Sequence, residues 1–264
     1  MNWKNFLPDI LRDVLEKYRE IKESREYRKI IKRREGITLR LDLELQDQII
    51  NSLKEKKIAA RVVSEELPYP LDLSKNPNLL IAIDPLDGTE NAYRERKPFS
   101  TVLTVFNTLK PKFSDVLCSG CVELSSGDMW YADQSGCYKN GKRVKTSNTK
   151  DLNKDTHCII DFYYPKNIEE FRPICEKARV RDYGSMATHL AWLASGQVDA
   201  VMSLYQKSHE LGAGYLMVKK AGGVITDIYG KPLEERKYDF NERIPFIASA
   251  NEELHKKILR ILNF

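Results

Sequence analysis

The chain has 264 residues, and 42% of them are apolar, which is enough for one large domain or two tightly packed halves. Its 43 basic residues outnumber 38 acidic ones, and this balance can favour anionic ligands without any dominant basic stretch that would indicate nucleic acid. No apolar stretch approaches membrane-spanning length, and residues 1–9 lack the apolar core of a secretory signal. We therefore expect a cytoplasmic protein.

The N-terminal segment predicts one long helix. Apolar residues recur at helical spacing from Ile10 to Ile21, Pro8 suits an early helical position, and Gly36 is expected to end the element. Its basic end, Lys32-Arg33-Arg34, could be a nucleic-acid patch, although short charge runs are usually solvated surface. A second helix is predicted over 42–54.

An apolar run at 79–83 is predicted to be a strand buried on both faces, and a shorter strand is predicted at 61–63. Further strands are predicted at 101–106, 116–122, 129–131, 157–162, 198–204, 224–228 and 244–248. Further helices are predicted at 185–194, 211–220 and 251–262, with a hairpin turn at Asn140-Gly141. These elements indicate a single layered α/β domain, strand-rich over about 1–150 and alternating strand with helix over 151–264.

Five cysteines are an odd number for a disulfide framework. Cys118 and Cys121 have the C-x-x-C spacing of a redox pair or half a zinc site, but no second pair accompanies them. Small apolar residues of a strand are the simpler interpretation.

The run at 79–83 leads directly into Asp84-Pro85-Leu86-Asp87-Gly88-Thr89. Pro85 favours a turn that can aim both carboxylates and the Leu86 carbonyl at one point. Two like charges at the end of a buried strand are costly unless a cation lies between them, and hard oxygen ligands favour Mg²⁺, Mn²⁺ or Ca²⁺. Because Asp, Pro and Gly are also ordinary turn residues, this segment alone leaves a metal site and a simple turn equally open.

Other acids lie in comparable positions. Glu65 and Glu66 follow the strand at 61–63, and Glu210 precedes the helix at 211–220, where an acid also stabilises the helix N-terminus. His209-Glu210 begins an H-E-x-x-H zinc-peptidase motif, but Ala213 stands where the second His is required. The chain also lacks the phosphate-binding loop of kinases and the G-x-S-x-G of serine hydrolases.

Together these motifs resemble the inositol monophosphatase and fructose-1,6-bisphosphatase superfamily, whose marker is an acid-Pro-apolar-Asp-Gly-Thr run. The resemblance covers nearly the whole chain, and its second half rests on Gly184-Ser185, Ser195-Gly196, Asp199-Ala200 and Ala221-Gly222-Gly223. It implies a sandwich of alternating α-β-α-β-α layers and a homodimer. It also implies a phosphatase that uses two or three Mg²⁺ ions, which Mn²⁺ can replace.

The resemblance also implies the roles of individual residues. The metal ligands would be Glu65, Asp84, Asp87, Glu210 and the Leu86 carbonyl. Thr89, paired with Asp42 and assisted by Glu66, would orient the attacking water and accept its proton. The substrate would contact Leu86, Asp87, Gly88, Thr89, Arg181, Gly184, Ser185, Met186 and Glu210, with the amides of Gly88 and Thr89 holding its phosphate.

Two departures from the family bear on the substrate. Monophosphatases usually have Trp-Asp where this chain has His209-Glu210, and inositol monophosphatases have a ring-binding Glu where it has Ser203. Both weaken the case for inositol as the preferred substrate. Basic residues that could bind a second phosphate, or simply belong to the surface, are Arg94, Arg96, Lys97 and Arg181. We therefore expect fructose 1,6-bisphosphate, inositol 1-phosphate or both to be hydrolysed.

Two alternatives remain. A nucleotide phosphatase acting on a 3′-phosphate, as in phosphoadenosine phosphate, would use an aromatic pocket, for which Tyr183, Trp192 and Tyr205 are candidates unless they are core. A non-catalytic relative could instead bind nucleic acid through the basic end of the first helix. We expect a small phosphorylated molecule as the partner, and neither nucleic acid nor a membrane.

Overall fold

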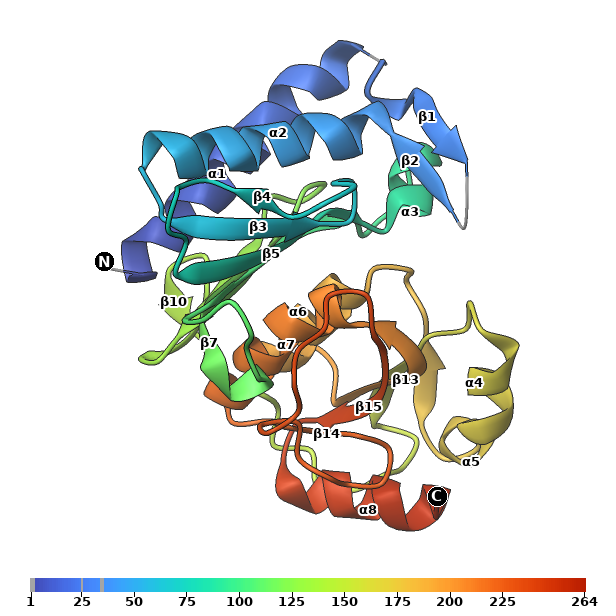
Figure 1. The fold of residues 1–264 in the computed structure, drawn as a ribbon. Coiled ribbons are helices and arrows are strands. Elements are labelled where there is room, and N and C mark those ends of the chain that lie inside the picture. The colour runs from blue at the N-terminus through green and yellow to red at the C-terminus, as the bar shows by residue number, and fades with distance from the viewer. Residues whose placement is uncertain (1–2, 25, 34–35) are drawn as a thin grey trace.

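The computed structural model describes residues 3–24, 26–33 and 36–264, and within these residues helices and sheets alternate in five layers (Figure 1). The first layer consists of α1 (Trp3–Ile21) and α2 (Arg40–Glu55). Their apolar faces and one face of the large sheet bury a common core. Among the helices of the described residues, none combines the length and apolar character needed to cross a membrane.

The prediction of one helix up to Gly36 is wrong, because the first helix ends at Ile21. Two short 3₁₀ turns, Lys22–Ser24 and Glu26–Arg28, bury none of their residues and lead into β1 (Ile30–Arg33). β1 pairs antiparallel with β2 (Ile37–Leu39). The segment after Ile21 is dominated by charged residues and lacks an apolar face that could extend the helix along the core. Arg34, part of the proposed basic patch, lies outside the described residues.

The second layer is a sheet of eight strands, as far as the described residues go, in the order β10-β9-β8-β7-β6-β5-β3-β4. These strands are β3 (Ala60–Ser64), β4 (Leu71–Asp72), β5 (Leu79–Asp87), β6 (Ser100–Phe106), β7 (Val116–Glu123), β8 (Met129–Asp133), β9 (Gly136–Lys139) and β10 (Lys142–Arg143). β3 and β5 run parallel, whereas the other neighbours are antiparallel. A short helix, α3 (Thr89–Tyr93), follows β5.

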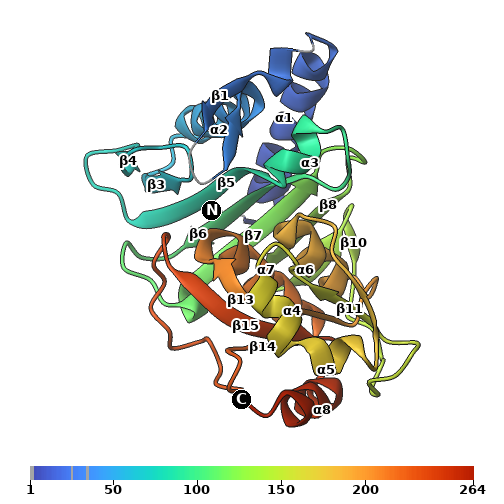
Figure 2. The ribbon, with the colours of Figure 1, turned by 90° about the vertical axis from the view of Figure 1, so that its right-hand side faces the viewer.

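The third layer, α6 (Met186–Ala194) and α7 (Ser208–Ala221), lies between the two sheets (Figure 2). The smaller sheet has the order β12-β11-β13-β15-β14. Its strands are β11 (His157–Ile160), β12 (Arg179–Arg181), β13 (Ala200–Lys207), β14 (Val224–Thr226) and β15 (Arg243–Ser249). The last layer contains α8 (Glu252–Leu262), which packs on β15, and α5 (Arg172–Cys175), which follows α4 (Pro165–Glu170). The expected α-β-α-β-α order is confirmed.

Apart from the first helix, the predicted helices and strands are found within a few residues of their expected bounds. The Asn140-Gly141 turn joins β9 to β10, and both residues have the positive φ that such a turn requires. The sequence analysis missed β1, β2, β4, β9, β10, β12, α3, α4 and α5. These elements are too short to show a periodicity.

Cys118 and Cys121 do not form a redox pair. Both are buried in β7, but they lie three residues apart and so point to opposite faces of the sheet, Cys118 toward α1 and Cys121 toward α7. Both thiols are free, and burial raises the pKa of each. The simpler interpretation as core residues is confirmed.

Gly214 allows α6 and α7 to pack closely, since a Cβ at that position would lie 2.1 Å from Leu190 Cδ1. We expect Gly214→Ala to lower the free energy of unfolding by about 1–3 kcal/mol through overpacking. Urea denaturation followed by circular dichroism would measure the loss. Gly36→Ala is the matched control, because, its chain neighbours aside, no heavy atom of the described residues lies within 4 Å of its added Cβ. Equal stability of the two variants would contradict this account of the interface.

Candidate active site

The parallel pairing of β3 with β5 brings Glu65 beside Asp84. Ser64, the last residue of β3, is paired with Ile83, so Glu65 follows the end of β3 next to Asp84, which continues in β5. Asp84 and Asp87, three residues apart, would point to opposite faces of a regular strand. The ladder between β5 and β6 is irregular there, with Asp84 opposite Val102 and Asp87 opposite Ser100. This bulge turns both carboxylates toward one point.

Two helix N-termini complete the group. Asp87 Oδ2 accepts hydrogen bonds from Ser185 Oγ and from the amide of Ala187, each at 2.7 Å, at the start of α6. Glu210 lies in the first turn of α7 and accepts a hydrogen bond from Gln206 Nε2. One oxygen from each of Asp84, Asp87 and Glu210 lies within 4.8 Å of the other two. We call Glu65, Asp84, Asp87 and Glu210 the acid cluster.

Burial makes this cluster electrostatically costly. It raises the pKa of Asp84 well above its ordinary value, with further contributions from Glu65 and Glu210. Burial likewise raises the pKa of Asp87 to about 6, against the hydrogen bonds from Ser185 and Ala187. The pKa of Glu210 is also raised, first by burial and then by Asp87. A bound cation would remove this cost, so the donor set fits a divalent ion.

Lys207 offsets part of the negative charge. Burial acts to raise the pKa of Glu65, but the ion pair with the Lys207 ammonium outweighs it and leaves that pKa below its ordinary value. One ammonium does not balance four carboxylates. The remaining charge is a further reason why the cluster fits a metal ion.

The structure also brings Thr89 and Asp42 together beside the cluster. Thr89 Oγ1 donates to the Leu86 carbonyl at 2.8 Å and lies 3.3 Å from Asp42 Oδ1. Asp42 is buried in the first turn of α2, and its second oxygen accepts the Leu39 amide at 2.8 Å. Burial raises the pKa of Asp42 well above its ordinary value, with contributions from Glu66 and Glu65.

Gly88 packs the start of α3 against the segment that precedes α6. It has a φ of +86°, and a Cβ there would lie 2.9 Å from the Gly184 carbonyl oxygen and 3.2 Å from Ser185 Cβ. The predicted substrate residues Gly184 and Ser185 are therefore close to the turn at Gly88 that is expected to bind phosphate. Within the described residues, no hydrogen bond from the amides of Gly88 and Thr89 is found.

Glu66 lies at the edge of the site. Its Oε1 accepts from Thr38 Oγ1 at 3.0 Å, and Lys32 Nζ lies 3.4 Å from its Oε2. Glu66 thus links the β1–β2 hairpin to the strand that carries Glu65. Lys32 belongs to the basic run that could have bound nucleic acid, and here it is paired with a carboxylate of the same chain.

Two further residues bear on substrate binding: Arg181, a predicted substrate contact, and Ser203, which stands where inositol monophosphatases have a ring-binding Glu. Arg181 is exposed on β12, and its guanidinium donates to the Val180 carbonyl at 2.7 Å. Ser203 is fully buried, and its hydroxyl donates to Asp161 Oδ2 at 3.2 Å. Asp161, which the sequence analysis missed, follows β11 and is only partly buried. The Ser203 hydroxyl is thus hydrogen-bonded to another side chain of the protein.

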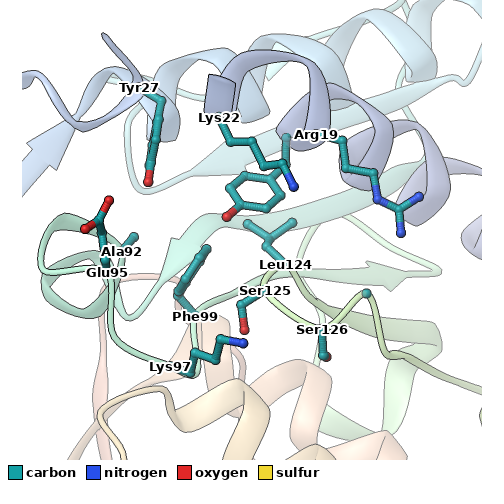
Figure 3. A pocket seen from close by; sticks show the side chains of 12 residues that line it. Arg19, Lys22, Tyr27, Ala92, Glu95, Lys97, Phe99, Leu124, Ser125 and Ser126 are labelled. Carbon is teal, nitrogen blue, oxygen red and sulfur yellow. The ribbon is translucent and has the colours of Figure 1, made fainter. Parts of the chain in front are cut away.

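A pocket of about 370 Å³ lies apart from the acid cluster and shares none of its residues (Figure 3). Arg19 from α1 and Lys22, which directly follows that helix, line one side, and Lys97 and Phe99 lie opposite. Lys97, a candidate for a second phosphate, therefore contributes to this separate pocket. Arg94, another such candidate, is paired with Glu90 at 3.1 Å.

The contribution of His209 was also missed. It was considered as part of a zinc-peptidase motif and as a departure from the family pattern, but not as a ligand, yet its Nε2 lies 3.7 Å from an oxygen of each of Glu65, Asp84 and Glu210. The signal in the sequence was its position directly before Glu210.

A family model described as the inositol monophosphatase family matches residues 9–264. The chain is 32% identical over 225 residues to fructose-1,6-bisphosphatase/inositol-1-monophosphatase of Archaeoglobus fulgidus, which covers 84% of this chain and 82% of that protein. It is 29% identical over 245 residues to a bifunctional NADP phosphatase/NAD kinase of Methanococcus maripaludis, covering 85% of this chain but 42% of that protein. A Thermotoga maritima IMPase structure has a TM-score of 0.81 at 22% identity, covering 100% of this chain and 97% of that one. The chain therefore belongs to the inositol monophosphatase family and is a phosphoric monoester hydrolase.

Proposed function

We propose that this enzyme is a Mg²⁺-dependent phosphatase of small sugar or inositol phosphates. The observation that carries the proposal is the acid cluster, whose buried oxygens converge beside the Thr89–Asp42 pair. The cluster holds several like charges together in a buried position, and this arrangement is expected of a cation site rather than of a simple turn. We further propose that the protein is a cytoplasmic homodimer, as the family resemblance suggests.

The ligands of the metal would be Glu65, Asp84, Asp87, Glu210 and the Leu86 carbonyl. All of them are oxygen donors, which suits Mg²⁺, with Mn²⁺ as a substitute, and their number suits two or three ions. When bound, the ions supply Lewis acidity toward water and positive charge for the phosphate and the leaving oxygen.

The residues of the chain would position the reactants and move the proton. The amides of Gly88 and Thr89 are available to hold the phosphate, as expected at a turn with free N–H groups. Thr89 can accept a hydrogen bond from the attacking water and pass a proton toward Asp42. The raised pKa of Asp42 makes that carboxylate a better proton acceptor, and Glu66 would assist from the edge of the site. Gly184, Ser185 and Met186 would contact the ring of the substrate, with Arg181 at its periphery.

Nucleotide phosphates are a second candidate class. They are favoured by the exposed rings of Phe162, Tyr163 and Tyr183, of which Phe162 is linked to the Tyr183 loop through Asp182. Such rings can stack on a base. The Methanococcus maripaludis relative is named as an NADP phosphatase, which agrees with this class. The non-catalytic alternative is set aside, because the family identifies a hydrolase.

We expect Asp84→Asn to lower phosphate release in Mg²⁺ by orders of magnitude, because it removes a buried ligand. In EDTA the same variant should gain about 0.5–2 kcal/mol of stability, since one like charge leaves the cluster. The gain should be larger at pH 7 than at pH 5. Carboxylates whose pKa is raised by folding destabilise the protein most when they are ionised, above that pKa.

Malachite-green phosphate assays and thermal unfolding would measure these two effects. Asp155→Asn is the control, because that side chain is 94% exposed. Near-normal turnover of Asp84→Asn, or undiminished wild-type phosphate release in excess EDTA, would show that the cluster is not a metal site.

Thr89→Ala should lower kcat by roughly 10²–10⁴-fold while metal affinity is retained, because the hydroxyl that relays the proton is lost. Asp42→Asn should have a similar effect. The double variant should lose little more than either single variant, since the two groups act as one unit. Single-turnover kinetics would measure each loss, and additive losses would show that Asp42 and Thr89 act separately.

Fructose 1,6-bisphosphate should be hydrolysed at least as efficiently as inositol 1-phosphate, with both accepted. The reason is that Ser203, which replaces the ring-binding Glu, is buried and cannot select a pattern of hydroxyl groups. Values of kcat/KM for both substrates and for NADP would decide the preference. Strong selection of inositol 1-phosphate would contradict the proposal, and selection of NADP would favour the second candidate class.

A further inference from the structure

The orientation of the His209 ring is the strongest feature that the proposed mechanism does not use. Its side chain is 5% exposed, and Nε2 lies 3.7 Å from Glu65 Oε2, Asp84 Oδ2 and Glu210 Oε1. These separations are too long for hydrogen bonds. Within the described residues, Nε2 has no hydrogen-bond partner. A buried polar atom without a partner is costly, so its position needs an explanation.

Phe240 fixes this orientation. The His209 ring stacks on the Phe240 ring with centroids 4.6 Å apart, and Nδ1 lies 3.4 Å from the Phe240 carbonyl oxygen. Because a carbonyl only accepts, Nδ1 carries the hydrogen of a neutral ring and leaves the Nε2 lone pair facing the carboxylates. Metal-bound histidines are commonly held in this way, by a carbonyl at the other ring nitrogen.

The distances around Nε2 fit a shared ion. Two ligands each about 2.1 Å from one ion lie at most about 4.2 Å apart, so separations of 3.7 Å need no rearrangement. Glu65 can take part although it is paired with Lys207, since Lys207 contacts Oε1 and leaves Oε2 toward His209. One ligand atom from each of Glu65, Asp84 and His209 lies within 4.8 Å of the other two.

We propose that His209 Nε2, Glu65 and Asp84 form a mixed nitrogen and oxygen cation position that prefers a first-row transition ion such as Mn²⁺, Co²⁺ or Zn²⁺ to Mg²⁺. The proposal rests on the proposed phosphatase site, because Asp84 would serve both this position and the all-oxygen position formed with Asp87 and Glu210. Mg²⁺ prefers oxygen ligands, whereas imidazole suits transition ions. His209 replaces the Trp that is usual in monophosphatases, so this preference would be a property of this chain.

The test uses Mn²⁺ as the probe on metal-free protein. Pulsed electron paramagnetic resonance should detect electron spin-echo modulation from a directly bound imidazole nitrogen in the wild type, and His209→Gln should lose it. Titration calorimetry should show a loss of Mn²⁺ affinity of about 10- to 100-fold in His209→Gln, with Mg²⁺ affinity largely unchanged.

His189→Gln is the matched control. His189 is also buried, and its ring nitrogens also lack a hydrogen-bond partner in the described part of the chain, but its ring packs against Tyr183 and Trp192. This variant should retain the nitrogen signal.

Bound Mn²⁺ without nitrogen modulation in the wild type would overturn the proposal, and so would an equal loss of Mg²⁺ and Mn²⁺ affinity in His209→Gln. The spectroscopic test needs only the wild type, so it stands even if His209→Gln does not fold. Mg²⁺-dependent phosphate release by the wild type in either case would leave the proposed function intact.

Discussion

The mutual repulsion of buried carboxylates is the constraint on which the rest of this structure depends. Asp84 and Asp87 lie at the end of a strand that is buried on both faces, and Glu210 meets them from the first turn of α7. In the absence of a cation, these acids repel one another, and the folding free energy of the rest of the chain must offset that repulsion. The core therefore surrounds a site that is strained when empty and relieved when filled, a compromise between stability and function that is common at active sites.

The two halves of the chain contribute unequally to that site. The large sheet supplies Glu65 and Asp84 through one parallel strand pair, and a bulge adds Asp87. The second half supplies the N-termini of α6 and α7. Asp87 is held by the first turn of α6, so one carboxylate both caps a helix and leaves its other oxygen toward the cluster. This shared residue couples the packing of the two halves to the geometry of the proposed metal ligands.

Much of this arrangement could be predicted from the sequence, because the acids follow strands whose apolar runs are easy to recognise. The family resemblance then supplied the layer order and the approach of Thr89 to Asp42. Gly36 was a poor guide to the end of the first helix, because α1 ends where its apolar face ends, at Ile21. The contact between Ser203 and Asp161 joins strands that are distant in sequence, and no local pattern indicates it. The orientation of His209 depends on Phe240, another distant contact.

The substitution of His209-Glu210 for the usual Trp-Asp changes the chemistry of this corner in two linked ways. A Glu side chain is one methylene longer than Asp, and here its Oε2 accepts a hydrogen bond from Gln206, near the end of β13. The adjacent ring directs a nitrogen at the same cluster, while Lys207 adds a cation two residues earlier. A short segment at the junction of β13 and α7 thus brings an ammonium, an imidazole and a carboxylate to one point. Such a combination would control which ions bind more than how the phosphate is held, because Gly88 and Thr89 belong to the opposite half of the molecule. Metal choice and substrate recognition can therefore vary independently in this fold.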